Sequence, residues 1–163
     1  MRRILHRSPG RPHEDDTMAE SKLPAWIQDH LSRYIATNGE DGYWWDATQG
    51  GGTGKVPTLL LTTTGRKSGQ QRTSALSYLR EGNRLLVLGS NFGQEHHPGW
   101  SSNLLAEPDA TVAISGAEIP VTATLLSGDE RERGIQRFLA YPMYQAYRTR
   151  TDRELRLFAL ARR

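Results

Sequence analysis

The sequence contains no cysteine and no long apolar segment. The lack of cysteine excludes disulfide bonds, thiolate metal sites and a cysteine nucleophile. No apolar stretch approaches the ~20 residues that a membrane-spanning helix needs. The basic N-terminus also lacks the apolar region of a secretory signal. We therefore expect a cytoplasmic protein.

The sequence also has little excess of either charge: 21 Lys and Arg against 18 Asp and Glu give a net charge of only +3. The chain has no continuous basic stripe, so nucleic acid is not an expected partner. Its 163 residues suffice for one domain with a substantial core. We expect 18–163 to form that domain. The polar segment 1–17 is expected to be disordered, or an added or upstream extension before Met18.

Hydrophobic periodicity and turn residues predict many short strands with helices at the ends. Helices are predicted at 24–37, 98–106 and 129–140 and from Pro142 onward; strands are predicted at 56–64, 72–80, 84–90, 110–115, 119–126 and 154–161. The segment 38–55, rich in glycine and aromatic residues, is predicted to be a loop. No strand–helix–strand spacing supports a parallel sheet. The predicted fold class is α+β, mainly β: an antiparallel barrel with flanking helices.

A cationic loop directly follows the apolar run 59–61. Residues 62–72 read TTTGRKSGQQR, so a strand leads into a tight turn that carries Arg66 and Lys67 between two glycines. Glycines let the backbone turn and expose its N–H groups, and the cations suit a phosphorylated or carboxylated ligand. The loop is not a P-loop, because its glycines are too close together. Composition alone leaves a solvated hairpin turn open.

Two segments after the third predicted strand carry further hydrogen-bond donors. They are 90–93 (SNFG) and 98–103 (PGWSSN). Backbone N–H groups and a helix start suit the polar edge of a flat ligand. A plain loop followed by a helix with a buried Trp100 is an equal alternative. The neighbouring Glu95-His96-His97 lacks the ligand spacing of a metal site, so no metal is predicted.

Three tyrosines, Tyr141, Tyr144 and Tyr147, recur every three residues behind Pro142. This spacing places them on one side of a helix. Core packing is the usual role of such a stripe. Three hydroxyl groups nevertheless favour a partly solvated wall in which each O–H has a partner. Both roles stay open from the residues alone.

Together these motifs resemble the deazaflavin-dependent nitroreductase family, whose members use coenzyme F420. The matching segments are LLLTTTGRKSGQ at 59–70 with Arg72 beyond, Ser90, the pattern PxWxxNL at 98–104 with Pro108 beyond, and YPxYxxY at 141–147 followed by TDR at 151–153. They occur in the family's order, over roughly 38–160. The resemblance implies a split β-barrel related to FMN-binding reductases.

The resemblance also implies a set of site residues. Those that would bind F420 are Lys55, Arg66, Lys67, Ser68, Arg72, Thr73, Ser74, Ala75, Leu76, Ser77, Leu88, Gly89, Ser90, Asn91, Gly99, Trp100, Ser101, Ser102, Asn103 and Tyr144. The cations would meet the cofactor's phosphate and acidic tail, and 88–91 would border its ring. The implied catalytic residues are Tyr141, Tyr144, Tyr147 and Ser90. Ser77 stands where the family often has an aromatic residue, which leaves the acceptor open.

The implied function is hydride transfer from reduced F420 to quinone-like or nitroaromatic acceptors. The alternatives are a non-enzymatic F420-binding or storage protein and an FMN-dependent reductase on the same barrel. The expected partner is a small, planar electron acceptor. A monomer, a homodimer and peripheral membrane contact through the aromatic residues 43–45 are all left open.

Overall fold

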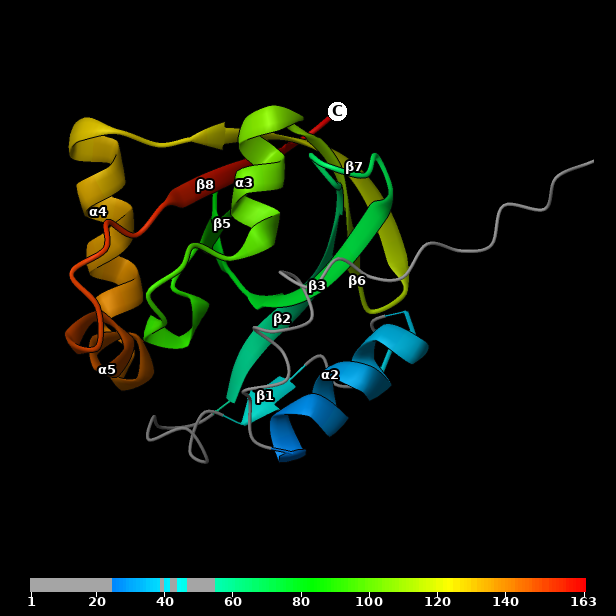
Figure 1. Cartoon of the computed structure of the whole chain (residues 1–163), viewed down its shortest axis with the longest axis horizontal. Coiled ribbons are helices and arrows are strands. Elements are labelled where there is room, and N and C mark those ends of the chain that lie inside the picture. The colour runs from blue at the N-terminus through cyan, green and yellow to red at the C-terminus, as the bar shows by residue number, and fades with distance from the viewer. Residues whose placement is uncertain (1–24, 39, 42–43, 47–54) are drawn as a thin grey trace, which may run out of the picture.

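A computed structural model describes residues 25–38, 40–41, 44–46 and 55–163 of the chain. The segment 1–17 and most of the loop predicted at 38–55 lie outside the described residues. Figure 1 shows a curled sheet with one helix across its opening and the other helices along its sides.

Eight strands of the described residues form one antiparallel, curled sheet. They are β1 (Trp44–Asp46), β2 (Lys55–Thr64), β3 (Gln71–Ser77), β4 (Leu79–Glu81), β5 (Arg84–Leu88), β6 (Asp109–Ile114), β7 (Ala117–Leu125) and β8 (Leu157–Arg162). Their order is β1-β2-β6-β7-β8-β5-β4, and β3 pairs with β2. The predicted antiparallel barrel and its six strand regions are thus confirmed. The short strand β1, inside the predicted loop, was missed.

The barrel closes through one bent segment. The sequence predicts a single strand over 72–80, but the structure divides it into β3 and β4, separated by Tyr78. β3 pairs with β2 and β4 pairs with β5, at opposite ends of the sheet order. At the bend, the backbone N–H of Tyr78 still donates to the carbonyl of Pro57, at 3.3 Å. A strand that joins two ends of a curled sheet must bend, which a period-two pattern does not reveal.

The hairpins follow from local backbone chemistry. Ile114 pairs with Ala117, so the β6–β7 turn contains only Ser115 and Gly116. Both have positive φ, 48° and 84°. This is the backbone of a type I′ turn, whose twist matches that of the flanking strands. The strand predicted at 110–115 therefore runs one residue too far, because it includes Ser115 of the turn.

The apolar run of β2 is buried on both faces of the sheet. Leu59 and Leu61 belong to the core inside the barrel, together with residues of β5, β6, β7 and β8. Leu60 points to the outer face, where it packs against the fully buried Tyr34. The Tyr34 hydroxyl donates to the carbonyl of Thr58, which ties the helix α2 (Ala25–Ala36) to β2.

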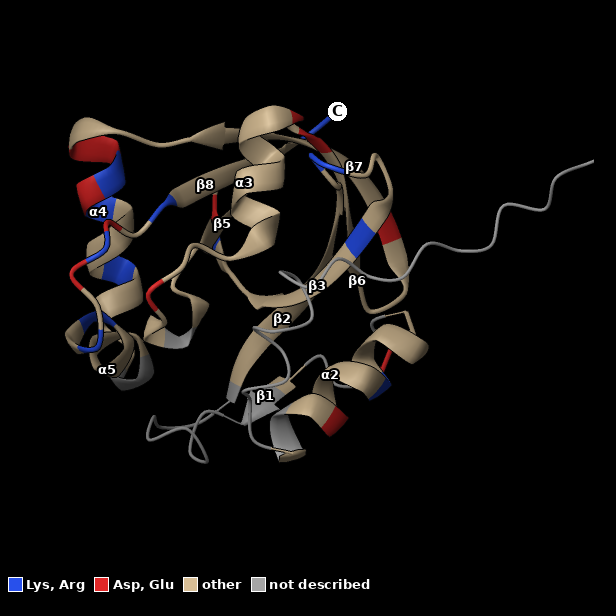
Figure 2. Cartoon of the chain, in the orientation of Figure 1, with Lys and Arg blue, Asp and Glu red and all other residues tan. Residues whose placement is uncertain are grey.

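Helices of the described residues cover the barrel at three places. They are α2 (Ala25–Ala36), α3 (Gly99–Ala106), α4 (Gly128–Leu139) and α5 (Pro142–Thr149), with a short helix η2 (Asn91–Gly93) before α3. α3 inserts Trp100 and Leu104 into the barrel core. α4 and α5 form a second core with Leu86 and Leu157. Figure 2 shows acidic residues at the start of α4 and basic ones further along, which suits the helix dipole.

Candidate functional site

The cationic loop between β2 and β3 is a tight turn. The N–H of Gly65 donates to the carbonyl of Gln70 at 2.7 Å, and the N–H of Gly69 donates to the carbonyl of Gly65 at 2.8 Å. Gly69 has a φ of 70°, which favours glycine. A Cβ at Gly65 would lie only 2.8 Å from Ser68 Oγ, so that glycine allows the turn to close. The turn leaves the Arg66 and Lys67 side chains exposed.

Arg66 is held in place by Asn103 of α3. Asn103 Oδ1 accepts hydrogen bonds from the backbone N–H of Arg66 at 3.1 Å and from its Nη1 at 2.9 Å. The Asn103 Nδ2 donates to Thr63 Oγ1 at 3.1 Å, and both residues are buried. Arg66 Nη1 also lies 3.4 Å from the carbonyl of Gly99. The hydrogen-bond partners of this guanidinium are therefore neutral.

A second arginine, Arg156, meets α3 from the segment that leads into β8. Its Nη1 donates to Ser101 Oγ and Ser102 Oγ, at 3.2 Å each. Ser101 is fully buried and its own hydroxyl donates to the carbonyl of Pro98 at 2.9 Å, so Ser102 is the more accessible of the pair. Sequence reasoning missed Arg156, because it lies in no local motif and reaches α3 only through the fold.

The loop 88–91 is packed tightly between α3 and the chain before β8. The N–H of Gly89 donates to the carbonyl of Arg156 at 2.8 Å. A Cβ at Gly89 would lie 3.3 Å from that carbonyl and 3.6 Å from Pro98 Cγ. Ser90 is 8% exposed, and Leu88 belongs to the core beside α4 and α5. The loop predicted to border the ring is thus fixed against α3.

Strand β3 divides the predicted cofactor residues between two faces. Residues that face each other across an antiparallel pair share a face of the sheet. Arg72, Ser74 and Leu76 pair with Thr63, Leu61 and Leu59, on the face of the barrel interior; Thr73, Ala75 and Ser77 pair with Thr62, Leu60 and Thr58, on the outer face. A ligand on one face meets only half of these side chains. The side chain of Lys55 lies outside the described residues.

The tyrosines of α5 form one aromatic side, as the spacing predicts. Their ring centroids are 6.4 Å apart for Tyr141 and Tyr144 and 5.9 Å apart for Tyr144 and Tyr147, in edge contact. Tyr144 and Tyr147 are only 6% and 7% exposed, so they are less solvated than the expected wall. The reason is close packing. The ring centroids of Phe138 and Tyr144 are 5.1 Å apart, and Gly93 of η2 packs directly against the backbone of Tyr147.

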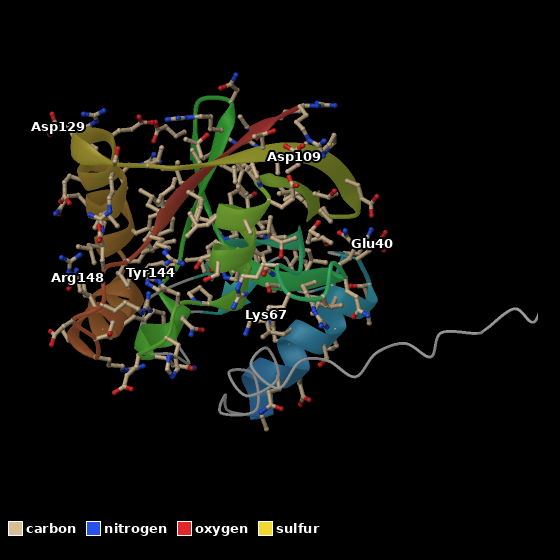
Figure 3. The ribbon with its side chains drawn as sticks, turned by 45° about the horizontal axis from the view of Figure 1, so that its top comes forward. Glu40, Lys67, Asp109, Asp129, Tyr144 and Arg148 are labelled. Carbon is tan, nitrogen blue, oxygen red and sulfur yellow. The ribbon has the colours of Figure 1, made fainter. Side chains whose placement is uncertain are left out.

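The hydroxyl of Tyr144 connects α5 to β3. Burial raises the pKa of Tyr144 far above its ordinary value, and a hydrogen bond with the Ser77 side chain acts in the opposite direction. Tyr144 therefore keeps its proton at neutral pH. Burial also raises the pKa of Tyr147, against the effect of Arg150, whose guanidinium lies 5.5 Å from the ring centroid. In Figure 3, Tyr144 points inward, while Arg148 of the same helix points outward.

α3 connects the predicted site segments. Through Asn103 it holds the cationic loop, through Ser101 and Ser102 it binds Arg156, and its start packs beside Gly89. The side chain of Trp100 instead packs in the core, 5.8 Å from Phe158. Figure 3 shows Lys67 near α3 and well apart from Tyr144. Lys67 of the cationic loop and Tyr144 of α5 thus lie in different parts of the molecule.

No three or more His, Cys, Asp or Glu side chains in the described part gather as a metal would need. No helix among the described residues is both long and apolar enough to cross a membrane.

Known proteins resemble the chain over most of its length. A family model described as F420H(2)-dependent quinone reductase matches residues 26–161. An F420H(2)-dependent quinone reductase of Mycobacterium tuberculosis (strain ATCC 25618 / H37Rv) is 33% identical over 138 residues, covering 82% of this chain and 88% of that protein.

Solved structures agree with this result. One described as an F420-H2 dependent reductase (FDR-A) is 37% identical, with a TM-score of 0.57, and covers 64% of this chain and 93% of its own. Another, described as a domain-swapped dimer, is 31% identical, with a TM-score of 0.59, and covers 83% of this chain and 96% of its own. The predicted split barrel and the family resemblance are confirmed: the chain belongs to the F420H(2)-dependent quinone reductase family.

Proposed function

We propose that this protein reduces quinones with electrons from reduced F420. The observation that carries the proposal is the Arg66 guanidinium, presented on a glycine-flanked turn and fixed by the buried Asn103. Its partners are neutral, so its charge is available to an anionic ligand. The names of the family and of its mycobacterial relative support F420H2 and a quinone as the reactants.

The residues at the cationic loop fit the acidic part of the cofactor. F420 carries a phosphodiester and an oligoglutamate tail, which favour Arg and Lys as partners. Arg66 is preorganised by Asn103, so less side-chain entropy is lost when it binds an anion. Lys67 is exposed beside it. From there the cofactor would follow α3 toward the loop 88–91.

When bound, reduced deazaflavin supplies a hydride from carbon, and the protein provides position and polarity. Among the tyrosines, Tyr144 is the best placed donor. Its O–H is protonated at neutral pH, as in any tyrosine, and burial raises its pKa further against the effect of a hydrogen bond with the Ser77 side chain. A neutral O–H that donates to the acceptor oxygen stabilises the negative charge that develops there. Tyr141, which is only partly buried, would lie nearer to the entering acceptor. Ser90, held beside α5 by η2, is the remaining catalytic candidate.

The partners and the location are part of the same proposal. A nitroaromatic compound is a second planar acceptor that the same hydride chemistry would reduce. The solved domain-swapped dimer at 31% identity supports a homodimer rather than a monomer. We propose a cytoplasmic protein that meets lipid-soluble quinones by peripheral contact with the membrane. The exposed Trp44, 54% accessible, supports that contact.

Fluorescence titration with F420, beside FMN and NADPH, tests the cofactor. We expect saturable F420 binding with weak FMN binding, followed by oxidation of F420H2 when menadione is added. Tight F420 binding without turnover on any quinone would instead identify a carrier protein. Binding of FMN but not F420 would identify a flavin reductase on the same barrel.

A further inference from the structure

Arg153, between α5 and β8, connects both ends and the middle of the loop that follows β5. Its Nη1 donates to the carbonyl of Gly89 and to His97 Nδ1, at 3.0 Å each. Its Nη2 donates to the carbonyls of Ser90 at 3.0 Å and Gln94 at 3.2 Å, and its Nε lies 3.4 Å from the Gln94 carbonyl. One planar group thus binds four residues of a nine-residue segment.

These contacts supply donors to carbonyls of a loop that lies outside the sheet, and the Ser90 carbonyl also accepts from the N–H of Gly93 at 2.9 Å. Loop carbonyls that are removed from water need hydrogen bonds as strongly as those in a sheet do. The rigid fork of a guanidinium can meet several of them at once, which a lysine ammonium cannot do with the same geometry. The backbone of Arg153 is held as well, because its N–H donates to Thr151 Oγ1 at 3.1 Å. All these acceptors are neutral.

We infer that Arg153 is a positioning residue that fixes the loop 89–97, and through it Ser90, against the bound cofactor ring. The inference rests on the proposed function, which places the ring beside this loop. Arg153 binds the Ser90 carbonyl and leaves the Ser90 side chain for other contacts. The loop also carries η2, whose Gly93 packs on the backbone of Tyr147. Arg153 therefore sets the position of the loop relative to the tyrosine helix as well.

His97 makes this arrangement sensitive to acid. A guanidinium has no acceptor, so His97 Nδ1 must accept the bond from Arg153 without a proton of its own. The charged groups that act on His97 are Arg153, Arg156 and Glu154. Burial and then the two arginines lower the pKa of His97, and Glu154 opposes them. Protonation would place a third cation beside the two arginines and break the bond.

The direction of the pH effect follows from that lowered pKa. The unfolded or loosened chain binds a proton near pH ~6.5, before the ordered loop does. The ordered loop is therefore fully favoured above about pH 6.5 and loses stability as the pH falls below it. We expect the rate of hydride transfer to have an acid limb in the same range.

Two variants and a control test the inference in the full chain. Arg153→Lys keeps the charge but cannot meet four acceptors, whereas His97→Gln keeps a neutral acceptor that does not titrate. Arg133→Lys, on the exposed face of α4, is the matched control. The readouts are amide hydrogen exchange of residues 89–97 and single-turnover oxidation of F420H2 by menadione between about pH 5 and 8.

For Arg153→Lys we expect faster exchange in residues 89–97 and hydride transfer slowed about 10- to 100-fold, because small misplacements of reacting groups have effects of that size. The F420 dissociation constant should change much less. His97→Gln should keep the rate at neutral pH and remove the acid limb, and Arg133→Lys should resemble the wild type in every readout.

Unchanged exchange in Arg153→Lys would overturn the inference while leaving the proposed function intact. An acid limb that persists in His97→Gln would overturn the role of His97. A wild-type protein that binds no F420 would overturn the proposed function and with it the link to the cofactor ring. The exchange data, which need no cofactor, would separate that failure from the others.

Discussion

The arginines around α3 and those around α4 differ in their partners. Beside α4, Arg84 lies 2.6 Å from a Glu130 oxygen and 2.8 Å from a Glu81 oxygen, and Arg131 lies 2.9 Å from Glu132. Around α3, Arg66 and Arg156 bond to an asparagine, to serines and to a carbonyl. Both groups of arginines are ordered by hydrogen bonds, but only the arginines beside α4 have carboxylate partners that neutralise their charge.

This difference separates cations that support the fold from cations that are available to a ligand. The bonds to Glu130 and then to Glu81 raise the pKa of Arg84, which shows that its charge is already compensated there. The Arg66 guanidinium is held in one orientation by Asn103, but Asn103 is neutral and does not compensate its positive charge. Abundance of arginine is thus a poor guide to an anion site, and the charge of the partner is a better one.

The largest expected effect is on Arg66. Arg66→Ala should weaken F420 binding by about 1.5–3 kcal/mol, the contribution of a hydrogen bond to a charged group, or roughly 10- to 150-fold in the dissociation constant. Fluorescence titration measures the change. Lys67→Ala, in the same turn, should have a smaller effect, because a lysine ammonium contacts an anion as a point charge and cannot form the two-pronged hydrogen bonds of a guanidinium.

Arg84→Ala is the matched variant among the arginines beside α4. It should leave the F420 dissociation constant unchanged, because both of its carboxylate partners lie beside α4. If Arg84→Ala weakened F420 binding as much as Arg66→Ala, the distinction between compensated and uncompensated arginines would fail. If neither arginine mattered, the cationic loop would be only a solvated turn.

Sequence reasoning succeeded where the pattern was local. The glycine-flanked turn at 65–70 and the tyrosine spacing of α5 are readable from consecutive residues, and both were predicted in the right element. Arg153 was noticed only as part of a motif and Arg156 not at all. Their partners lie more than 50 positions away in the chain, so only the closed barrel brings them to α3 and the loop.

The same limit explains why 72–80 was predicted as a single strand and why the role of the tyrosines stayed open. The bend at Tyr78 arises because β3 and β4 pair with different strands. This is a tertiary requirement, and no glycine or proline at the bend indicates it in the sequence. The burial of Tyr144 and Tyr147 depends on Phe138 and on η2, which packs against α5 through Gly93. A stripe of tyrosines indicates a helix face, but not what covers that face.

A smaller effect is expected at Tyr144, which lies outside both groups of arginines. Tyr144→Phe should lower the turnover of F420H2 with menadione about tenfold, which corresponds to the loss of one hydrogen bond of about 1.4 kcal/mol. The F420 dissociation constant should change little, opposite to the pattern for Arg66→Ala. Steady-state kinetics beside fluorescence titration separate the two effects.

Ser77→Ala provides the control for Tyr144, because it removes the partner of the Tyr144 hydroxyl without touching the ring. It should lower turnover less than Tyr144→Phe does, since the O–H remains but is less well oriented. If the Tyr144→Phe protein lost cofactor affinity but kept its turnover, Tyr144 would contact the cofactor and not the acceptor.

The smallest effect is expected for the ion pair beside α4. Glu130→Gln removes the carboxylate that Arg84 meets at 2.6 Å, but both side chains are partly exposed, at 31% for Arg84 and 42% for Glu130. Water screens such a pair, so the free energy of unfolding should fall by only about 0.2–1 kcal/mol. Urea denaturation measures it, and the difference from the wild type should shrink in about 1 M salt, where the Debye length is only ~3 Å. F420 affinity should not respond to this change. If it did, charge around α4 would be coupled to the α3 site, and the two groups of arginines would have to be treated as one electrostatic unit.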